Sequence, residues 1–504
     1  MLRFDAMRYF ILALMALSFA TCSTDQKTAD TLQIDSLKLS TYLSELASDQ
    51  FLGRMPFTEG ETMTVNYIRD ELAKAGVEPG NGASYFQEVK LVRISSERDP
   101  MLNIKTKDGA LSLQFLDDFA GGTTRVEETT TIENSELVFV GYGIVAPEYD
   151  WNDYTGLDMT GKTAVVVVND PGFRTKNEAL FKGNAMTYYG RWTYKYEEAA
   201  RQGADGVLII HEDDAAGYPW SVVRGGWGGD QMVLDLDHKN LKDCKLQGWI
   251  TRGQAAELFS MSGHDLEKAL KEAYEPGFEA FSLEATYSFG MSHSLDFNTS
   301  KNVLGKITGS KYPEETIIFT AHWDHFGIGE AIDGDSIYNG AVDNATGTAA
   351  IMEIGRQFAA MDTKPERSII LLAVTAEEQG LLGSQYYSEN PIYPVEKTVA
   401  NLNIDAIYGY GRTQDIEIIG YGQSEMDDYA RTVCDKYGLE VIPDTNTEKG
   451  YFFRSDHIHF AKLGIPCFYG KNGMNSIKNG PEWGREQHDL YRDQNYHAPS
   501  DEFD

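Results

Sequence analysis

The feature that most constrains the fold is a regular alternation of short apolar runs and amphipathic segments from Lys301 onwards. Strands rich in Ile and Val that are separated by helices predict an α/β fold, in which a mixed, mainly parallel sheet is covered by helices on both faces. Such a sheet binds its ligands in the crevice at the carboxyl ends of the strands. The expected strands are NVLGKITG, TIIFTAHWD, RSIILLAVTAEE, VANLNIDAI and DIEIIGYG, and the expected helices are NATGTAAIMEIGRQFAAM and SEMDDYARTVCDKYGL.

Histidines and acidic residues gather where these predicted strands end. A single residue of this kind is usually a helix cap or part of the solvated surface. Several at one edge of a sheet indicate a metal site instead. The residues are His322 and Asp324 after TIIFTA, Asp343 at the start of a helical segment, Glu377 and Glu378 after LLAVTA, Asp405 after ANLNI, and His497 in the final NYHAPSDEFD.

Strand geometry separates the roles of these residues in part. Residues i and i+2 of a strand point to the same side, so His322 and Asp324 can face the crevice together while Trp323 points away. His322 can then bind a metal, and Asp324 can accept its other imidazole N–H or order neighbouring ligands. Glu377 and Glu378 diverge, so one can coordinate metal and the other can act as a base. We expect His325 to be structural or near the substrate.

The types of ligand point to zinc. Histidines and carboxylates without cysteine suit zinc in an open catalytic site rather than in a closed structural one. The carboxylates are sufficient for two ions if one of them bridges the pair.

Residues 301–504 resemble the co-catalytic di-zinc aminopeptidases of peptidase family M28, whose relatives include bacterial leucine aminopeptidases and glutamate carboxypeptidase II. The resemblance implies the zinc-exopeptidase (phosphorylase/hydrolase-like) fold. The matching segments occur in the family's order and are AHWDH, GAVDNATGTA, TAEEQGLLGS, the NID of LNIDAI, RSDHIHFAKLGIP and YHAPSD.

The resemblance also implies a role for each residue. Two zinc ions would be held by the metal ligands His322, Asp343, Glu378, Asp405 and His497, with Asp343 bridging, His322 and Asp405 completing one site, and Glu378 and His497 the other. Glu377 would be the general base, with Asp324 as an orienting carboxylate. Ser455 and Asp456 would lie beside the substrate pocket.

The length of 504 residues predicts two folded units. We expect residues 36–125 and 291–504 to form the peptidase-like unit, with helices over 36–50 and 58–77. Residues 126–290 are β-rich and resemble an inserted protease-associated domain, in which SVVRGGWGGDQ has no periodicity and is expected to be a loop. The chain ends seven residues after His497, where members of the family usually continue into a further helix, so a C-terminal helix is expected to be missing or replaced.

The first 22 residues predict export. Arg3 and Arg8 precede an apolar run from Tyr9 to Ala20, which is typical of a signal peptide. Cys22 resembles the lipidated cysteine of bacterial lipoproteins, and residues 23–35 would then be a tether. The expected location is the periplasm or the cell surface, with membrane contact only through the signal or the lipid anchor, and the alternative is a secreted protein. The remaining cysteines are too few for a disulfide framework, although a Cys434–Cys467 bridge remains an alternative to free thiols.

Charge excludes one class of partner. The 77 acidic and 44 basic side chains give a formal net charge of −33, which would repel nucleic acid. The leading expectation is therefore an exported zinc aminopeptidase acting on peptides. The alternatives are a carboxypeptidase or dipeptidase of the same family, a glutaminyl cyclase, and an inactive receptor-like binding protein. Oligomeric state is left open.

Overall fold

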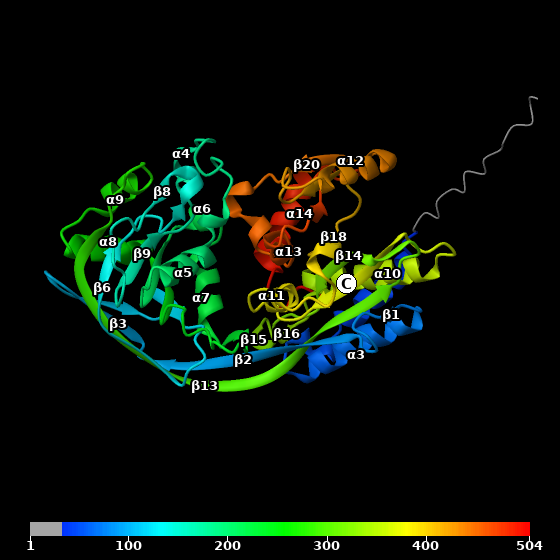
Figure 1. The fold of residues 1–504 in the computed structure, drawn as a ribbon, viewed down its shortest axis with the longest axis horizontal. Helices are drawn as coiled ribbons and strands as arrows, with labels where there is room; N and C mark the ends of the chain where they lie inside the picture. Colours follow the sequence, from blue (N-terminus) through cyan, green and yellow to red (C-terminus); the bar gives the residue numbers. More distant parts are fainter. Residues whose placement is uncertain (1–32, 504) are drawn as a thin grey trace, which may run out of the picture.

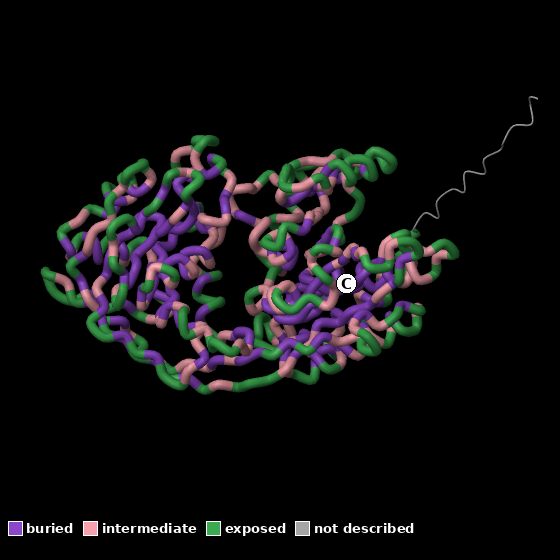
Figure 2. Tube along the Cα trace, viewed as in Figure 1, coloured by how far each residue is buried: buried purple, intermediate pink, exposed green. Residues whose placement is uncertain are grey.

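The computed structural model describes residues 33–503 and shows two lobes joined by a long β-ribbon (Figure 1). The ribbon consists of β2 (Phe86–Arg98) and β13 (Phe281–Ile307), which pair antiparallel from Val303 opposite Phe86 to Met291 opposite Arg98. Each lobe has its own buried interior (Figure 2). The lobes are called the α/β lobe and the β-rich lobe below.

The α/β lobe contains the mixed, mainly parallel sheet, which confirms the predicted fold class. Four central strands are parallel neighbours, and the end of β13 and strand β19 add antiparallel pairings at either side. In order across the sheet, the strands after β13 are β17 (Arg367–Val374), β14 (Tyr312–His322), β18 (Thr398–Asn403), β21 (Cys467–Asn472), β19 (Asp415–Ile418) and β20 (Glu440–Pro443).

Helices cover both faces of this sheet, because alternate strand residues point to opposite sides. Leu371 and Ala373 pack towards one group of helices, while Ile370 and Leu372 pack towards another. Asp35 caps the first helix by accepting hydrogen bonds from the backbone N–H groups of Leu37 and Lys38. One face carries α2 (Ser36–Leu46), α3 (Glu59–Lys74) and α10 (Thr346–Ala360), and the other carries α11 (Leu382–Glu389) and α13 (His457–Lys462).

The β-rich lobe begins earlier in the chain than residue 126. Its core includes Leu102, Ile104, Leu113 and Phe119, which pack with residues as far along the chain as Met291. The predicted limit missed them because the strands that carry these residues are short and their alternation continues that of β2. The strands of this lobe are β3 (Met101–Thr106), β4 (Gly109–Gln114), β5 (Phe119–Gly122), β6 (Thr129–Phe139), β9 (Thr163–Val167), β10 (Gly206–His211) and β12 (Leu246–Thr251).

The segment SVVRGGWGGDQ is not a loop, which corrects the prediction. Most of it forms helix α7 (Trp220–Gly228), and its last residue begins strand β11 (Gln231–Leu234), which pairs with β2. Val223 and Trp227, four residues apart, are buried on one face of the helix. These two buried side chains stabilise the helix, although its glycines leave no helical periodicity in the sequence.

Helix α14 (Gly480–Gln494) lies directly before His497 and was not predicted. Cys244, Cys434 and Cys467 are free thiols, so the alternative of a Cys434–Cys467 bridge is wrong. The other elements are β1 (Glu78–Pro79), β7 (Val145–Ala146), β8 (Trp151–Asn152), α4 (Pro171–Thr175), α5 (Trp192–Arg201), α6 (Asp213–Ala216), α8 (Arg252–Met261), α9 (Leu266–Ala273), β15 (Gly327–Ile332), β16 (Asp335–Tyr338) and α12 (Met426–Tyr437).

The predicted signal and the lipidated Cys22 lie outside the described residues. Among residues 33–503, no helix has the length and apolar character needed to span a bilayer.

Candidate metal centre

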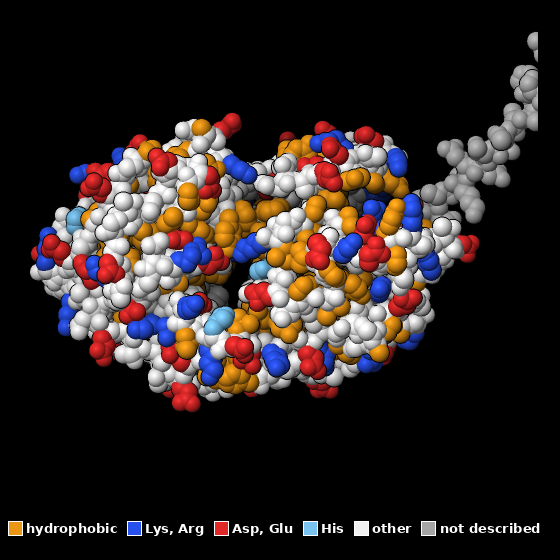
Figure 3. Space-filling view, in the orientation of Figure 1, with side chains coloured by type: hydrophobic (Ala, Val, Ile, Leu, Met, Phe, Trp, Pro, Cys, Tyr) orange, Lys and Arg blue, Asp and Glu red, His pale blue; other side chains and the backbone are white. Residues whose placement is uncertain are grey.

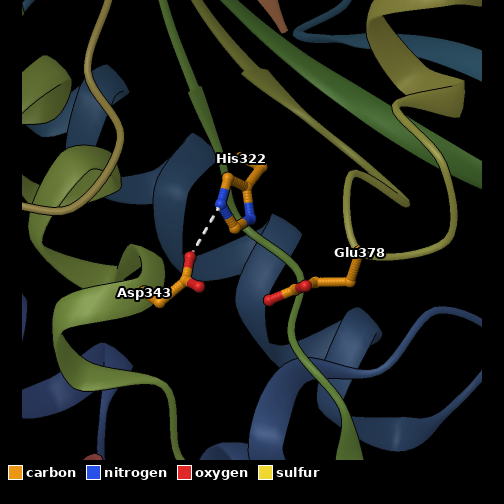
Figure 4. A group of neighbouring side chains, drawn as sticks. All are labelled: His322, Asp343 and Glu378. Carbon is orange, nitrogen blue, oxygen red and sulfur yellow. Dashed lines mark ion pairs between the residues drawn. The ribbon is translucent and has the colours of Figure 1, made fainter. Parts of the chain in front are cut away.

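The predicted ligands meet at one edge of the α/β sheet. His322 is the last residue of β14, and Asp343 lies in the short segment Ala341–Ala345 that leads into α10. Glu378 follows β17, and its side chain points towards the space between the other two (Figure 4). Strand ends that are far apart in sequence therefore converge on one space, as expected for a sheet of this type.

The carboxylate of Asp343 lies between the two histidines. Its Oδ1 is 3.1 Å from Nε2 of His322, and its Oδ2 is 3.4 Å from Nε2 of His497. Each carboxylate oxygen thus faces a different imidazole. This is the arrangement required of a carboxylate that bridges two metal ions.

Each histidine has a second carboxylate partner. His322 Nε2 lies 3.5 Å from Oδ1 of Asp405, and His497 Nε2 lies 3.2 Å from Oε2 of Glu378. Groups of ligand atoms within 4.8 Å of one another also cross this division, because Glu378 is grouped with His322 and Asp343. The distance of 3.2 Å between Glu378 and His497 nevertheless favours placing Glu378 in the half of the centre that contains His497.

The residues fit a pair of metal cations. Among the described residues, none is placed with the geometry of a hydrogen bond to the buried Nε2 atoms of His322 and His497, although carboxylate oxygens lie close to both. Burial by itself lowers the pKa of His322, but Glu377, Asp343 and Asp405 outweigh it and raise that pKa well above its usual range. Burial likewise lowers the pKa of His497, but Glu378 and Asp343 outweigh burial and raise this pKa to about 10. A site that attracts protons so strongly without metal will also attract zinc, and the imidazole and carboxylate ligands are those of catalytic zinc.

Asp324 holds the two glutamates rather than the imidazole of His322. Its fully buried carboxylate accepts hydrogen bonds from the backbone N–H groups of Glu377 at 3.1 Å and of Glu378 at 3.3 Å. His322 Nδ1 instead lies 3.2 Å from the backbone carbonyl of Asp324 and 3.8 Å from its carboxylate. Of the two roles left open by the sequence, the geometry fits the ordering of neighbouring ligands. Burial raises the pKa of Asp324 to about 7.

Glu377 stands at the edge of the centre. Its Oε2 lies 4.0 Å from Nε2 of His322, further away than either Asp343 or Asp405. Burial, opposed by His322 but reinforced by Asp405 and Glu378, raises the pKa of Glu377 well above its usual range. Burial and the neighbouring carboxylates thus favour the protonated form of this carboxyl group.

Ser455 is buried and contacts a predicted metal ligand, Asp405. Its hydroxyl donates a hydrogen bond to Oδ2 of Asp405 at 2.6 Å and accepts one from Nδ2 of Asn403 at 2.7 Å. Asp456 is similarly buried, and burial raises its pKa to about 7. Both residues are buried, and their expected place beside the substrate stays a prediction.

His325 was expected to be structural or near the substrate, without a named partner. Its Nδ1 forms a 2.6 Å hydrogen bond with Oε1 of Glu378, so it orients that carboxylate from outside the ligand set. A histidine three residues after His322 could have suggested proximity, but not this partner.

Comparisons with known proteins bear on this site. Residues 302–504 match the family described as Peptidase family M28. A probable glutamate carboxypeptidase of Arabidopsis thaliana is 25% identical over 406 residues, which cover 71% of this chain and 53% of that protein. An aminopeptidase of Mus musculus is 36% identical over 138 residues, which cover 26% of this chain and 17% of that protein. The aligned part of the chain thus spans 53% or less of the length of these two curated relatives.

Among solved structures, an aminopeptidase from Aneurinibacillus sp. strain AM-1 aligns with a TM-score of 0.49 at 20% identity, covering 93% of this chain and 88% of that one.

Proposed function

Because residues 302–504 match the family described as Peptidase family M28, we propose that this chain is an exported zinc aminopeptidase that removes N-terminal residues from peptides. The observation that carries the proposal is the carboxylate of Asp343, which faces His322 with one oxygen and His497 with the other. The described chain thus provides two half-sites that share one ligand.

His322 and Asp405 would hold one zinc ion, and Glu378 and His497 the other, with Asp343 between them. When bound, two zinc ions lower the pKa of a water molecule towards neutrality and polarise the peptide carbonyl.

Glu377 would move the proton. It is a buried carboxyl group with a raised pKa at the edge of the centre, so it can accept a proton from the attacking water and deliver it to the departing amine. Asp324 fixes the backbone of Glu377 and Glu378 by accepting a hydrogen bond from the N–H group of each residue. Their side chains can then serve different tasks from adjacent positions.

Metal content and exopeptidase activity test this proposal together. Metal analysis of the purified chain should find close to two zinc ions per chain, and aminoacyl-p-nitroanilides should be cleaved until a chelator is added. One zinc ion per chain would favour glutaminyl cyclisation, and none would favour a receptor-like binding protein. Equal cleavage of N-acetylated peptides would reject the aminopeptidase assignment.

A second candidate, a carboxypeptidase or dipeptidase, is favoured by three cations, Arg191, Arg454 and Lys471. The charge of Arg191 interacts with Glu377, and that of Lys471 with Asp405 and Asp343. Within the described part of the chain, the buried Nε atoms of Arg191 and Arg454 have no hydrogen-bond partner. Arg454 and Lys471 both lie over the ring of Tyr451, at 5.4 and 4.7 Å from its centroid. Tyr469 of β21 pairs with Asn403 of β18. Lys471 and Asp405 each lie two residues further along these two chain segments.

Such cations suit a substrate carboxylate, and they occur in a chain of strongly negative net charge. The alignment with a probable glutamate carboxypeptidase supports the same candidate. Dipeptides with a free or an amidated C-terminus decide between the two. An aminopeptidase tolerates the amide, whereas an enzyme that recognises the carboxylate loses most of its activity on it.

Export through the N-terminal signal and lipidation of Cys22 complete the proposal and rest on sequence alone. Metabolic labelling with a radioactive fatty acid should label the chain, and Cys22→Ala should remove the label. Labelling that persists in the variant would contradict this assignment.

A further inference from the structure

Arg54 is a buried cation with an unusual set of partners. It is 0% exposed, and the four hydrogen bonds recorded for its guanidinium all end on backbone carbonyls. Its Nε donates to Trp323 at 2.8 Å and its Nη2 to Gly340 at 2.9 Å. Its Nη1 donates to both Leu46 and Asn339.

Three of these carbonyls, those of Trp323, Asn339 and Gly340, belong to the two segments that carry metal ligands, and the fourth, that of Leu46, ends α2. Trp323 lies between His322 and Asp324, directly after β14. Asn339 and Gly340 lie directly before Ala341–Ala345, which contains Asp343. One rigid, planar fork therefore joins the backbone that carries His322 to the backbone that carries the bridging carboxylate.

The segment around Asp343 is held from the other side by Asp501. The carboxylate of Asp501 accepts hydrogen bonds from the backbone N–H groups of Val342 at 3.0 Å and of Asp343 at 3.1 Å. Gly340 has a φ of +53°, and an added Cβ would lie 2.5 Å from the ring of His325, so no other residue fits there. The backbone leading to Asp343 has little freedom beyond what Arg54 and Asp501 allow.

Charge gives Arg54 a second effect on the centre. Burying a cation costs several kcal/mol unless nearby negative charge compensates. Burial lowers the pKa of Arg54 to about 10, and the carboxylates that oppose this shift are Asp501, Asp324, Asp343 and Glu378. The attraction is mutual, so Arg54 also relieves the repulsion among the carboxylates of the centre.

We propose that Arg54 is a positioning residue of the metal centre, which sets the spacing between His322 and Asp343 through their backbones. The proposal rests on the proposed function, because it concerns the same two-metal site. Within residues 33–503, no hydrogen bond joins the guanidinium of Arg54 to the side chain of a predicted metal ligand. Arg54 acts through the peptide groups on either side of the centre.

Metal binding by the full chain tests the proposal without reference to activity. We expect Arg54→Met to weaken zinc affinity by about 10- to 100-fold, the usual effect of removing a group that orients ligands. The same change should shift the visible absorption of the cobalt(II)-substituted protein, because ligand geometry changes. Arg54→Lys keeps the charge but not the fork, so it should recover only part of the affinity.

Arg98→Met is the matched control, because Arg98 is a half-buried arginine that also donates to a backbone carbonyl, that of Gly121 in the β-rich lobe. It should leave zinc affinity and the cobalt spectrum unchanged. Leu72→Ala, a core change in α3, controls for lost stability and should lower the melting temperature without altering either readout.

Several outcomes overturn the proposal. The positioning role is rejected if folded Arg54→Met or Arg54→Lys has the same zinc affinity and the same cobalt spectrum as the unmodified chain. If Arg54→Met does not fold, Arg54→Lys decides alone, and full affinity in that variant rejects the role of the fork. A chain that binds two zinc ions but cleaves no peptide rejects the proposed function while leaving this inference to be judged by its own readouts.

Discussion

Glu377 and Glu378 are neighbours in the sequence but differ in protonation. Burial acts to raise both pKa values, but His497 and His325 reverse the effect at Glu378 and lower its pKa to about 2. At Glu377, Asp405 and Glu378 add to the effect of burial and the pKa stays well above its usual range. One carboxylate is thus permanently charged, as a metal ligand must be, and the other can exchange protons.

Replacing Glu377 with Gln should separate these functions. The amide keeps the shape but cannot accept a proton, so we expect kcat to fall by about 10²- to 10⁴-fold. Zinc content should stay near that of the unmodified chain, because Glu378 remains in place. Glu389→Gln, at the exposed end of α11, is the matched control and should change neither quantity. Activity that persists in Glu377→Gln would assign the base elsewhere.

Ser455→Ala tests whether this residue serves the metal or the substrate. The hydroxyl holds Oδ2 of Asp405, so its loss should weaken zinc affinity by roughly 10-fold while KM for peptides stays unchanged. Ser388→Ala, which removes only a local hydroxyl contact within α11, should have no effect. A rise in KM at unchanged zinc affinity would instead place Ser455 at the substrate.

Of the five ligand positions, that of His497 has no local signal of this kind. The other four could be predicted because each follows an apolar strand or opens a helix, and both are visible as local patterns. The residues that support the ligands could not. The contact of His325 with Glu378 joins residues 53 positions apart, and that of Arg54 with Gly340 joins residues 286 positions apart. A single sequence carries no local signal for such partners. The buried hydroxyl of Ser455 likewise depends on how β18 and α13 meet.

At the scale of elements, strongly periodic segments formed as predicted and weakly periodic ones did not. The five expected strands from Lys301 onwards all formed, because runs of Ile and Val have few alternatives to a buried strand. Helix α7 was missed because only Val223 and Trp227 mark its buried face among glycines. Its helical state depends on the pocket that receives these two side chains, which is tertiary information.

The role of α7 can be tested by truncating its anchor. Trp227 is 8% exposed and belongs to the β-rich core, so Trp227→Ala should lower the free energy of unfolding by about 3 to 5 kcal/mol. Val222→Ala lies on the exposed face of the same helix, at 52% exposed, and should change it by less than about 0.5 kcal/mol. Chemical denaturation followed by circular dichroism measures both. If both variants lose only a small and similar amount of unfolding free energy, α7 does not contribute to the stability of the lobe through Trp227.

At the scale of the whole molecule, segments on either side of the β-rich lobe in the sequence pack into one core. Acidic and basic side chains are interspersed over the visible face, and a hollow separates the lobes there (Figure 3). Beneath this surface, side chains from the first helices pack against the sheet formed more than 200 residues later. The shared core includes Tyr42, Leu46, Val65, Ile68 and Leu72 with Val303, Ile307, Ile369, Leu371 and Ala373.

Residues 302–504, the part that matches the peptidase family, should therefore not fold alone. Each of the five early side chains contributes about 1.5 to 3 kcal/mol on burial. Together they rival the whole stability of a typical domain, about 5 to 15 kcal/mol. Arg54 would also be absent. The isolated fragment should show no cooperative thermal transition by calorimetry and no tight zinc binding, whereas residues 33–504 should show both.

A shorter chain provides the matched control, because Arg98 and Met291 face each other across the β2–β13 ribbon. Joining residues 33–98 to 291–504 through Asn-Gly closes that ribbon as a hairpin. This chain should melt cooperatively and bind zinc, at a lower temperature than the full chain because Met232 and Leu234 no longer cover Val89. If residues 302–504 fold and bind zinc as well as this chain does, the early helices are dispensable and the centre is self-contained.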